Sequence, residues 1–150
     1  MKLYCAQAAG CGPIVTTIKE RADIVKPVKP NTIAKSLAIG NPADGYYATK
    51  AVLASGGWAE AATDDEIIEA MKLLAETEGV FTETAGGVTL AAAKKLIAQG
   101  VIPRDESIVV CITGNGLKTQ EPLMQRVGEP VRIRPTLASF EQSLGSRLAA

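Results

Sequence analysis

The stretch that decides the fold reads Ile108-Val109-Val110-Cys111-Ile112 and continues as Thr113-Gly114-Asn115-Gly116-Leu117-Lys118. An unbroken apolar run of this length, ending in a hydroxyl residue and two glycines, predicts a buried parallel strand that delivers a polar side chain to a tight loop. Proteins of the α/β class bind ligands at the carboxyl ends of such strands. We therefore expect a ligand loop at 113–118.

Short strands and longer helices alternate through the rest of the chain. The patterns predict strands at 3–7, 58–62 and 107–112, and helices at 13–20, 46–55, 63–78 and 88–99. The glycines at 86 and 87 are interpreted as a turn before the last of these helices. This alternation predicts an α/β fold with a mostly parallel sheet flanked by helices, as a single domain over residues 1–150.

The charge and hydropathy patterns exclude two classes of partner. Sixteen basic residues balance sixteen acidic ones, with no long block of either sign, so a nucleic-acid partner is not expected. No apolar segment approaches the roughly 20 residues that span a bilayer, so a membrane partner is not expected either. The chain start lacks the long apolar core of a secretory signal, and we expect a cytoplasmic protein.

Histidine is absent from the chain. The commonest general base and the commonest metal ligand are therefore missing, and no metal site is predicted. The three cysteines, Cys5, Cys11 and Cys111, are odd in number and lie among apolar residues or glycines, which favours buried thiols over disulfides. Catalysis here would need a cofactor, a lysine or a carboxylate.

Two further loops carry glycines beside a predicted helix. Gly10 and Gly12 could cradle a phosphate, although a compact strand-to-helix turn is favoured because the spacing matches no phosphate-binding fingerprint. Glu83 stands directly before the turn at 84–87, in a second loop of the kind that lines clefts.

Five motifs in order carry a family resemblance. They are Gln7 to Val15, Thr32 to Pro42, Ser55-Gly56-Gly57, Glu78-Gly79-Val80-Phe81 and Thr113 to Lys118. Over about residues 4 to 118 the chain resembles the carboxyl-terminal part of threonine synthase, a fold-type II pyridoxal-phosphate enzyme. The resemblance implies a three-layer partial domain of the tryptophan-synthase-β type.

The resemblance also implies a set of cofactor contacts. The Thr113 hydroxyl would lie beside the pyridine nitrogen of pyridoxal 5'-phosphate, and the Gly114 backbone would pass close to the ring. Glu83 and Ala85 would lie near the cofactor edge. The family's Schiff-base lysine and phosphate loop belong upstream of the matched part, and no lysine here has that context. No catalytic residue is therefore assigned.

The implied activity is that of a lyase in threonine biosynthesis, which converts O-phosphohomoserine and water to threonine and phosphate. This chain would supply one wall of the pocket, bind no cofactor alone and be inactive alone. Two alternatives stay open: part of a related lyase such as threonine dehydratase, or a non-catalytic α/β association module that complements a separate lysine-bearing chain. An exposed sheet edge or apolar face would also favour a homo-oligomer.

Overall fold

The computed structural model describes residues 1–124, 126–128 and 130–148. Its contacts group into two units, Met1–Gln120 and Glu121–Ala150, and each is described by itself. The expectation of a single domain over the whole chain stays a prediction.

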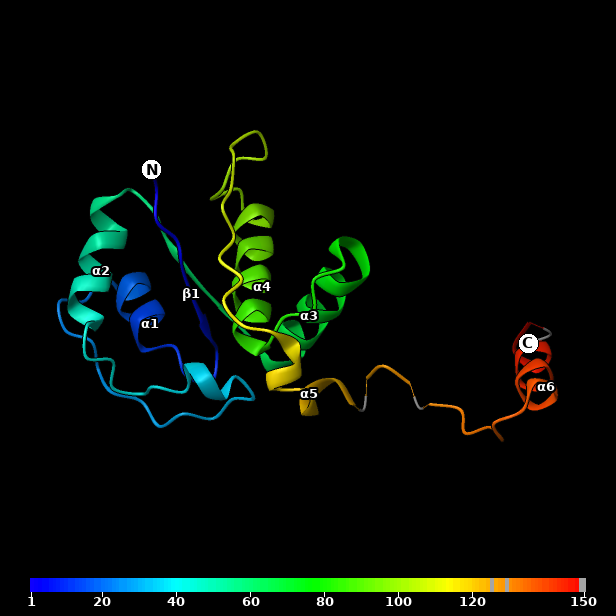
Figure 1. The fold of residues 1–150 in the computed structure, drawn as a ribbon. Helices are drawn as coiled ribbons and strands as arrows, with labels where there is room; N and C mark the ends of the chain where they lie inside the picture. Colours follow the sequence, from blue (N-terminus) through cyan, green and yellow to red (C-terminus); the bar gives the residue numbers. More distant parts are fainter. Residues whose placement is uncertain (125, 129, 149–150) are drawn as a thin grey trace. The chain divides into compact units, whose positions relative to one another are not determined.

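The first unit is a parallel strand pair between two layers of helices. Strands β1 (Cys5–Ala8) and β2 (Ala59–Ala62) pair in parallel, with Cys5 opposite Ala59. The remaining elements are α1 (Pro13–Glu20), the 3-10 helix η1 (Lys35–Leu37), α2 (Gly45–Ala54), α3 (Asp64–Glu78), α4 (Thr84–Ala98) and the 3-10 helix η2 (Gly116–Lys118). The strands lie between the α1–α2 pair and the α4–α3 pair (Figure 1). The predicted three-layer α/β class is confirmed.

The turn between β1 and α1 is compact. Pro13 opens the helix, where its missing N–H costs nothing. The Gln7 side chain reaches from β1, and its Oε1 accepts hydrogen bonds from the backbone N–H groups of Ile14 and Val15, both at 2.9 Å. These amides already have a partner, which supports the compact-turn interpretation over a phosphate cradle.

Helix α3 begins and ends where its capping residues predict. The Thr63 hydroxyl accepts from the Glu66 N–H at 3.3 Å, and the Glu66 carboxylate accepts from the Thr63 N–H at 2.8 Å. This reciprocal pair is the predicted capping box. The helix ends at Glu78 and is followed by Gly79, whose φ of 67° suits a residue without a side chain.

Helix α4 begins at Thr84, four residues before the predicted start. Gly86 and Gly87 therefore lie inside the helix, and the predicted turn at these glycines is wrong. A Cβ on Gly86 would overlap the Thr82 side chain, and one on Gly87 would overlap Met71 and a carbonyl of α3. The glycines are required because α4 packs closely on its neighbours.

The predicted strand at 107–112 is also wrong. These residues form no strand, and Ile108 and Val109 are 41% and 88% exposed. A buried parallel strand needs neighbours that accept and donate its backbone hydrogen bonds, and in the described chain this run pairs with neither β1 nor β2. Cys111 is consequently exposed, against expectation, whereas Cys5 is half-buried and Cys11 is buried.

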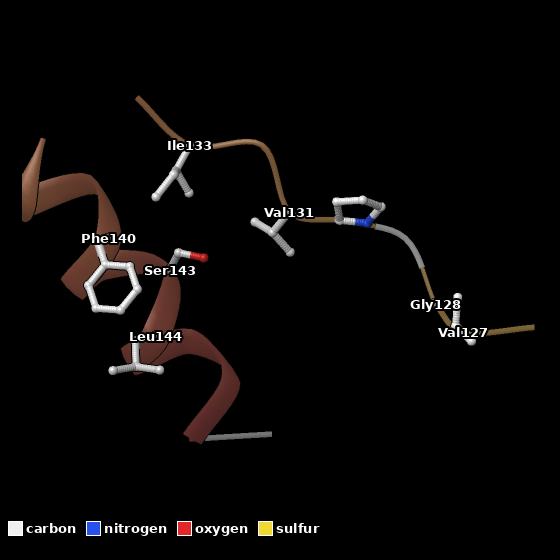
Figure 2. A pocket seen from close by; sticks show the side chains of 8 residues that line it. Val127, Gly128, Val131, Ile133, Phe140, Ser143 and Leu144 are labelled. Carbon is white, nitrogen blue, oxygen red and sulfur yellow. The ribbon is translucent and has the colours of Figure 1, made fainter. Parts of the chain in front are cut away.

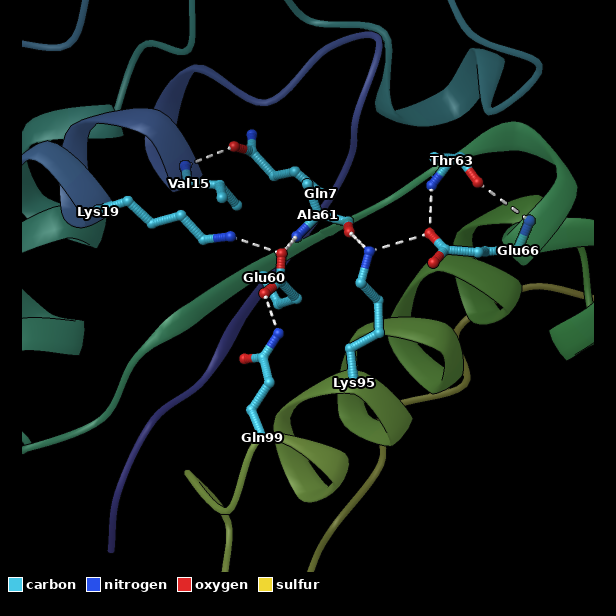
Figure 3. Close-up of polar contacts among 9 residues, drawn as sticks. All are labelled: Gln7, Val15, Lys19, Glu60, Ala61, Thr63, Glu66, Lys95 and Gln99. Atoms are coloured by element: carbon cyan, nitrogen blue, oxygen red, sulfur yellow. Dashed lines mark hydrogen bonds and ion pairs between the residues drawn. The ribbon is translucent and has the colours of Figure 1, made fainter.

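Glu60 ties β2 to the helices on either side (Figure 3). Its carboxylate accepts hydrogen bonds from Lys19 of α1 at 2.6 Å, from Gln99 after α4 at 2.8 Å and from the Ala61 N–H at 2.8 Å. Burial raises the pKa of this carboxyl, but those hydrogen bonds and the Lys19 charge outweigh burial and lower the pKa to about 2. Glu60 is therefore ionised at neutral pH.

The second unit contains α5 (Glu121–Met124) and α6 (Leu137–Leu148). Thr136 directly precedes α6, and its hydroxyl accepts from the Ser139 N–H at 3.3 Å. The extended piece before α6 and the helix itself line a hollow of about 450 Å³ (Figure 2). Its lining residues are Val127, Gly128, Pro130, Val131, Ile133, Phe140, Ser143 and Leu144. None of the predicted site residues lies there.

Across both units, every described helix falls short of the length and apolarity that a membrane span requires.

Candidate functional site

The start of α4 and the loop at 113–118 meet through their backbones. The Glu83 N–H donates to the Gly114 carbonyl at 3.0 Å, and the Gly116 N–H donates to the Phe81 carbonyl at 2.9 Å. Thr82 and Asn115 consequently face each other in an antiparallel bridge. The two loops that were singled out from the sequence are therefore adjacent, although no strand delivers the second one.

The close approach of these loops requires glycine at two positions. A Cβ on Gly114 would overlap the Glu83 carboxylate, and a Cβ on Gly116 would overlap the Phe81 ring. Because neither neighbour is a freely moving surface side chain, any larger residue would push the loop away from α4.

Glu83 lies at the centre of the contact and is 5% exposed. One carboxylate oxygen is 3.5 Å from the Lys118 ammonium, and the other accepts from the Ser36 hydroxyl at 3.5 Å. Lys118 is 65% exposed, so this ion pair contributes at most about 1 kcal/mol. The arrangement nevertheless joins three segments that are distant in sequence: η1, the start of α4 and the 113–118 loop.

The predicted cofactor residues differ in their surroundings. Glu83 and Ala85 are buried at the first turn of α4, and Gly114 is half-buried against Glu83. Thr113 directly precedes Gly114 and is exposed. The structure thus brings Glu83 and Gly114 into contact and leaves the Thr113 side chain accessible beside them.

Sequence reasoning missed two buried hydroxyl residues at this site. The Thr82 hydroxyl lies 3.1 and 3.2 Å from the carbonyl oxygens of Glu83 and Gly114, so it donates to the bridge between the loops. Thr84 is fully buried, and its hydroxyl has no hydrogen-bond partner among the described residues. No pattern among the neighbouring residues marks these two threonines, because their burial depends on the segments that pack against the start of α4.

Two features of this site bear on whether it could hold a flat heteroaromatic ring. Thr113 is exposed, so its side chain is accessible, whereas the space on the Cβ side of Gly114 is already filled by the Glu83 carboxylate. The nearby Lys118 amine is paired with Glu83. The site therefore has groups that could orient a ring, but no amine in the sequence context that holds one covalently.

Reactive thiols and metal-binding clusters are the other chemical groups to consider among the described residues. Burial raises the pKa of Cys5 to about 11 and also raises that of Cys11, so neither thiol is ionised at neutral pH. No group of three or more His, Cys, Asp or Glu side chains in this part of the chain could hold a metal ion.

Comparison with known proteins finds similarity to pyridoxal-phosphate dependent enzymes. A family model described as pyridoxal-phosphate dependent enzyme matches residues 1–114. The chain is 46% identical to threonine synthase of Methanocaldococcus jannaschii over 133 residues, covering 88% of this chain and 33% of that protein. It is 37% identical to threonine synthase of Methanosarcina acetivorans over 144 residues, covering 95% and 36%. The predicted resemblance to threonine synthase is confirmed.

Solved structures show the same fold at low sequence identity. Maize serine racemase superposes with a TM-score of 0.60 at 19% identity, covering 97% of this chain and 39% of that one. An L-serine ammonia-lyase from Rhizomucor miehei gives 0.60 at 19%, covering 85% and 42%. The chain spans about a third of the length of the curated relatives it matches.

Proposed function

Because this chain belongs to the pyridoxal-phosphate dependent enzyme family, we propose that it supplies one wall of the cofactor pocket of a threonine synthase. The substrates would be O-phosphohomoserine and water, and the products threonine and phosphate. The observation that carries the proposal is the contact between Glu83 and Gly114, which joins the two loops that resemble cofactor-binding segments.

Each site residue then has a distinct task. When bound, pyridoxal phosphate supplies an electron sink. The Thr113 hydroxyl would lie beside the ring nitrogen, where a neutral group does not hold a proton as a carboxylate would. The Gly114 backbone would pass close to the ring, and the Glu83 carboxylate, held between Ser36 and Lys118, would keep the loop in place. Ala85 would line the edge of the pocket.

The chain alone should be inactive, because proton transfer from the substrate and covalent capture of the cofactor both need the lysine that the resemblance assigns to the upstream part. We also expect it to bind no cofactor by itself. The cytoplasmic location expected from the sequence stays a prediction.

Activity measurements on the separate and mixed parts test the proposal. The 150-residue chain is assayed with pyridoxal phosphate and O-phosphohomoserine, alone and after mixing with the separately expressed upstream part of the M. jannaschii threonine synthase. Phosphate release is expected only in the mixture. Threonine formation by the chain alone would refute the proposed division of roles.

A matched pair of variants tests the role of Thr113. Because Thr113→Ser keeps the hydroxyl and Thr113→Val removes it at nearly constant volume, the first should keep most of the activity of the mixture and the second should lose at least tenfold in kcat. The absorbance of the bound cofactor should shift only in Thr113→Val. If both variants had equal activity, the Thr113 hydroxyl would not contact the cofactor, and the proposed role of Thr113 would be wrong.

Two alternatives are separated by the same mixture. Turnover of threonine in place of O-phosphohomoserine would identify a dehydratase. A stable mixture that binds no cofactor would identify a non-catalytic association module, which the exposed apolar side chains of Ile108 and Val109 favour as a second candidate.

A further inference from the structure

Thr82 joins the two loops of the candidate site through one buried hydroxyl. Its Oγ1 lies 3.1 Å from the Glu83 carbonyl oxygen and 3.2 Å from the Gly114 carbonyl oxygen, and the residue is fully buried. A threonine hydroxyl has one proton to donate, so the two carbonyls share it. The Glu83 carbonyl also accepts from the Gly87 N–H at 3.2 Å, in the first turn of α4. The hydroxyl therefore ties the first turn of the helix to the 113–118 loop.

The Gly114 carbonyl is fixed by two donors. It accepts from the Glu83 N–H at 3.0 Å as well as from the Thr82 hydroxyl. A carbonyl oxygen has two lone pairs, so this arrangement satisfies both of them. Without the hydroxyl, one lone pair at a buried contact would lose its donor, and the loop would be held less firmly against α4.

The Thr82 side chain is itself held in one place. A Cβ on Gly86 would overlap Thr82 Oγ1, so the glycine makes room for this hydroxyl beside α4. Glycine is unfavourable inside a helix, and close packing on Thr82 gives this position a physical reason. Since threonine is branched at Cβ, its χ1 angle is also restricted. The hydroxyl consequently has little freedom to turn away from the Gly114 carbonyl.

The chain before the loop supplies no anchor of its own. Residues 107–113 form no secondary structure and make no hydrogen bond to another described residue. The nearest fixed point beside Thr113 is therefore the Gly114 carbonyl. Because Thr113 directly precedes Gly114, a shift of that carbonyl moves the Thr113 side chain with it.

We propose that Thr82 is a positioning residue, whose hydroxyl holds the 113–118 loop so that the Thr113 hydroxyl faces the cofactor pocket. The task of Thr113 rests on the proposed function, whereas the hold on the loop rests on the hydrogen bonds alone. Thr82 has no exposed surface, so it acts through Thr113 and not by touching a ligand.

Amide exchange in the 150-residue chain tests the hold on the loop. The reporters are the N–H groups of Glu83 and Gly116, which donate across the contact. Thr82→Val fills nearly the same space without a hydroxyl, and exchange at both reporters should become about tenfold faster. Thr82→Ser keeps the hydroxyl and should stay within threefold of the wild type. Unchanged exchange in Thr82→Val would overturn the proposal.

Thr17→Val is the matched control. Thr17 lies in α1, is 3% exposed and donates its hydroxyl proton to the Pro13 carbonyl at 2.8 Å. The control therefore removes a buried hydrogen bond of the same kind away from the loop. Exchange at Glu83 and Gly116 should match the wild type. An equal acceleration in the control would indicate general loosening of the fold and would overturn the specific role of Thr82.

A double-mutant cycle tests whether Thr82 acts through Thr113. It is measured in the mixture with the upstream part of the M. jannaschii threonine synthase. Thr82→Val should lower kcat at least fivefold, leave KM for O-phosphohomoserine within twofold and shift the cofactor absorbance as Thr113→Val does. Because the two hydroxyls act in series, the double variant should be no slower than Thr113→Val alone. Losses that multiply would place the effect of Thr82 elsewhere and overturn the proposal.

The two measurements separate this inference from the proposed function. Absence of turnover in the wild-type mixture would reject the proposed function, while the exchange rates would still decide whether Thr82 holds the loop. Normal turnover by Thr82→Val would keep the enzyme and reject the positioning role.

Discussion

Replacing Glu60 with glutamine should remove a measurable, pH-dependent part of the stability. At 1.36 kcal/mol per pH unit, the gap between the ordinary pKa of 4.5 and the value of about 2 in the folded chain corresponds to about 3 kcal/mol. Because the folded pKa lies below the unfolded one, this stabilisation is fully present above about pH 4.5. It is lost as the pH falls from there towards 2.

Urea unfolding followed by circular dichroism measures the effect. The wild-type chain and Glu60→Gln are compared at pH 7, 5, 3.5 and 2.5, with Glu76→Gln on the exposed side of α3 as the control. Glu60→Gln should be about 3 kcal/mol less stable at pH 7, and the difference should shrink at acidic pH as the wild-type carboxyl is protonated. If the free energies of unfolding of the wild type and Glu60→Gln differed by the same amount at all four pH values, the assigned ionisation of the Glu60 carboxyl would be refuted. The control should follow the wild type throughout.

Three other substitutions test local features of the first unit. Thr63→Ala removes the hydroxyl of the capping box with Glu66 and should cost about 1 kcal/mol in urea unfolding at pH 7; a loss below about 0.3 kcal/mol would contradict the cap. Gly114→Ala places a methyl group against the Glu83 carboxylate and should lower the free energy of unfolding in urea by about 1–3 kcal/mol. An unchanged urea midpoint would mean that the 113–118 loop does not pack against Glu83. Val109→Ser should change the stability of the isolated chain by less than about 0.5 kcal/mol because Val109 is exposed; a loss of about 2 kcal/mol would indicate the buried strand after all.

Local sequence signals were reliable where neighbouring residues suffice to satisfy the backbone. Pro13 and the Thr63–Glu66 pair gave the starts of α1 and α3, because caps and proline act within a few residues. The approach of the Glu83 and Gly114 loops was expected from a family resemblance and a general rule about strand ends. The structure instead achieves it through a short antiparallel bridge at Thr82.

Features that depend on segments far apart in the sequence could not be predicted from neighbouring residues. The glycines at 86 and 87 signalled a turn, but the space beside α3 made them interior helix residues. The hydroxyls of Thr82 and Thr84 carried no local signal of burial, since exposure depends on what packs above them. Glu60 lies in the predicted strand at 58–62 with no local sign of its partners, which come from α1 and the end of α4.

The sequence by itself determined the α/β class, most helix boundaries and the resemblance to threonine synthase, because periodicity, caps and motif order are properties of adjacent residues. The tertiary structure decided that the run at 108–112 is not a strand, that Glu60 is held between α1 and the end of α4, and that the start of α4 meets the loop at 113–118. Strand formation requires a second backbone to exchange hydrogen bonds, and the presence of that partner is a property of the assembled sheet.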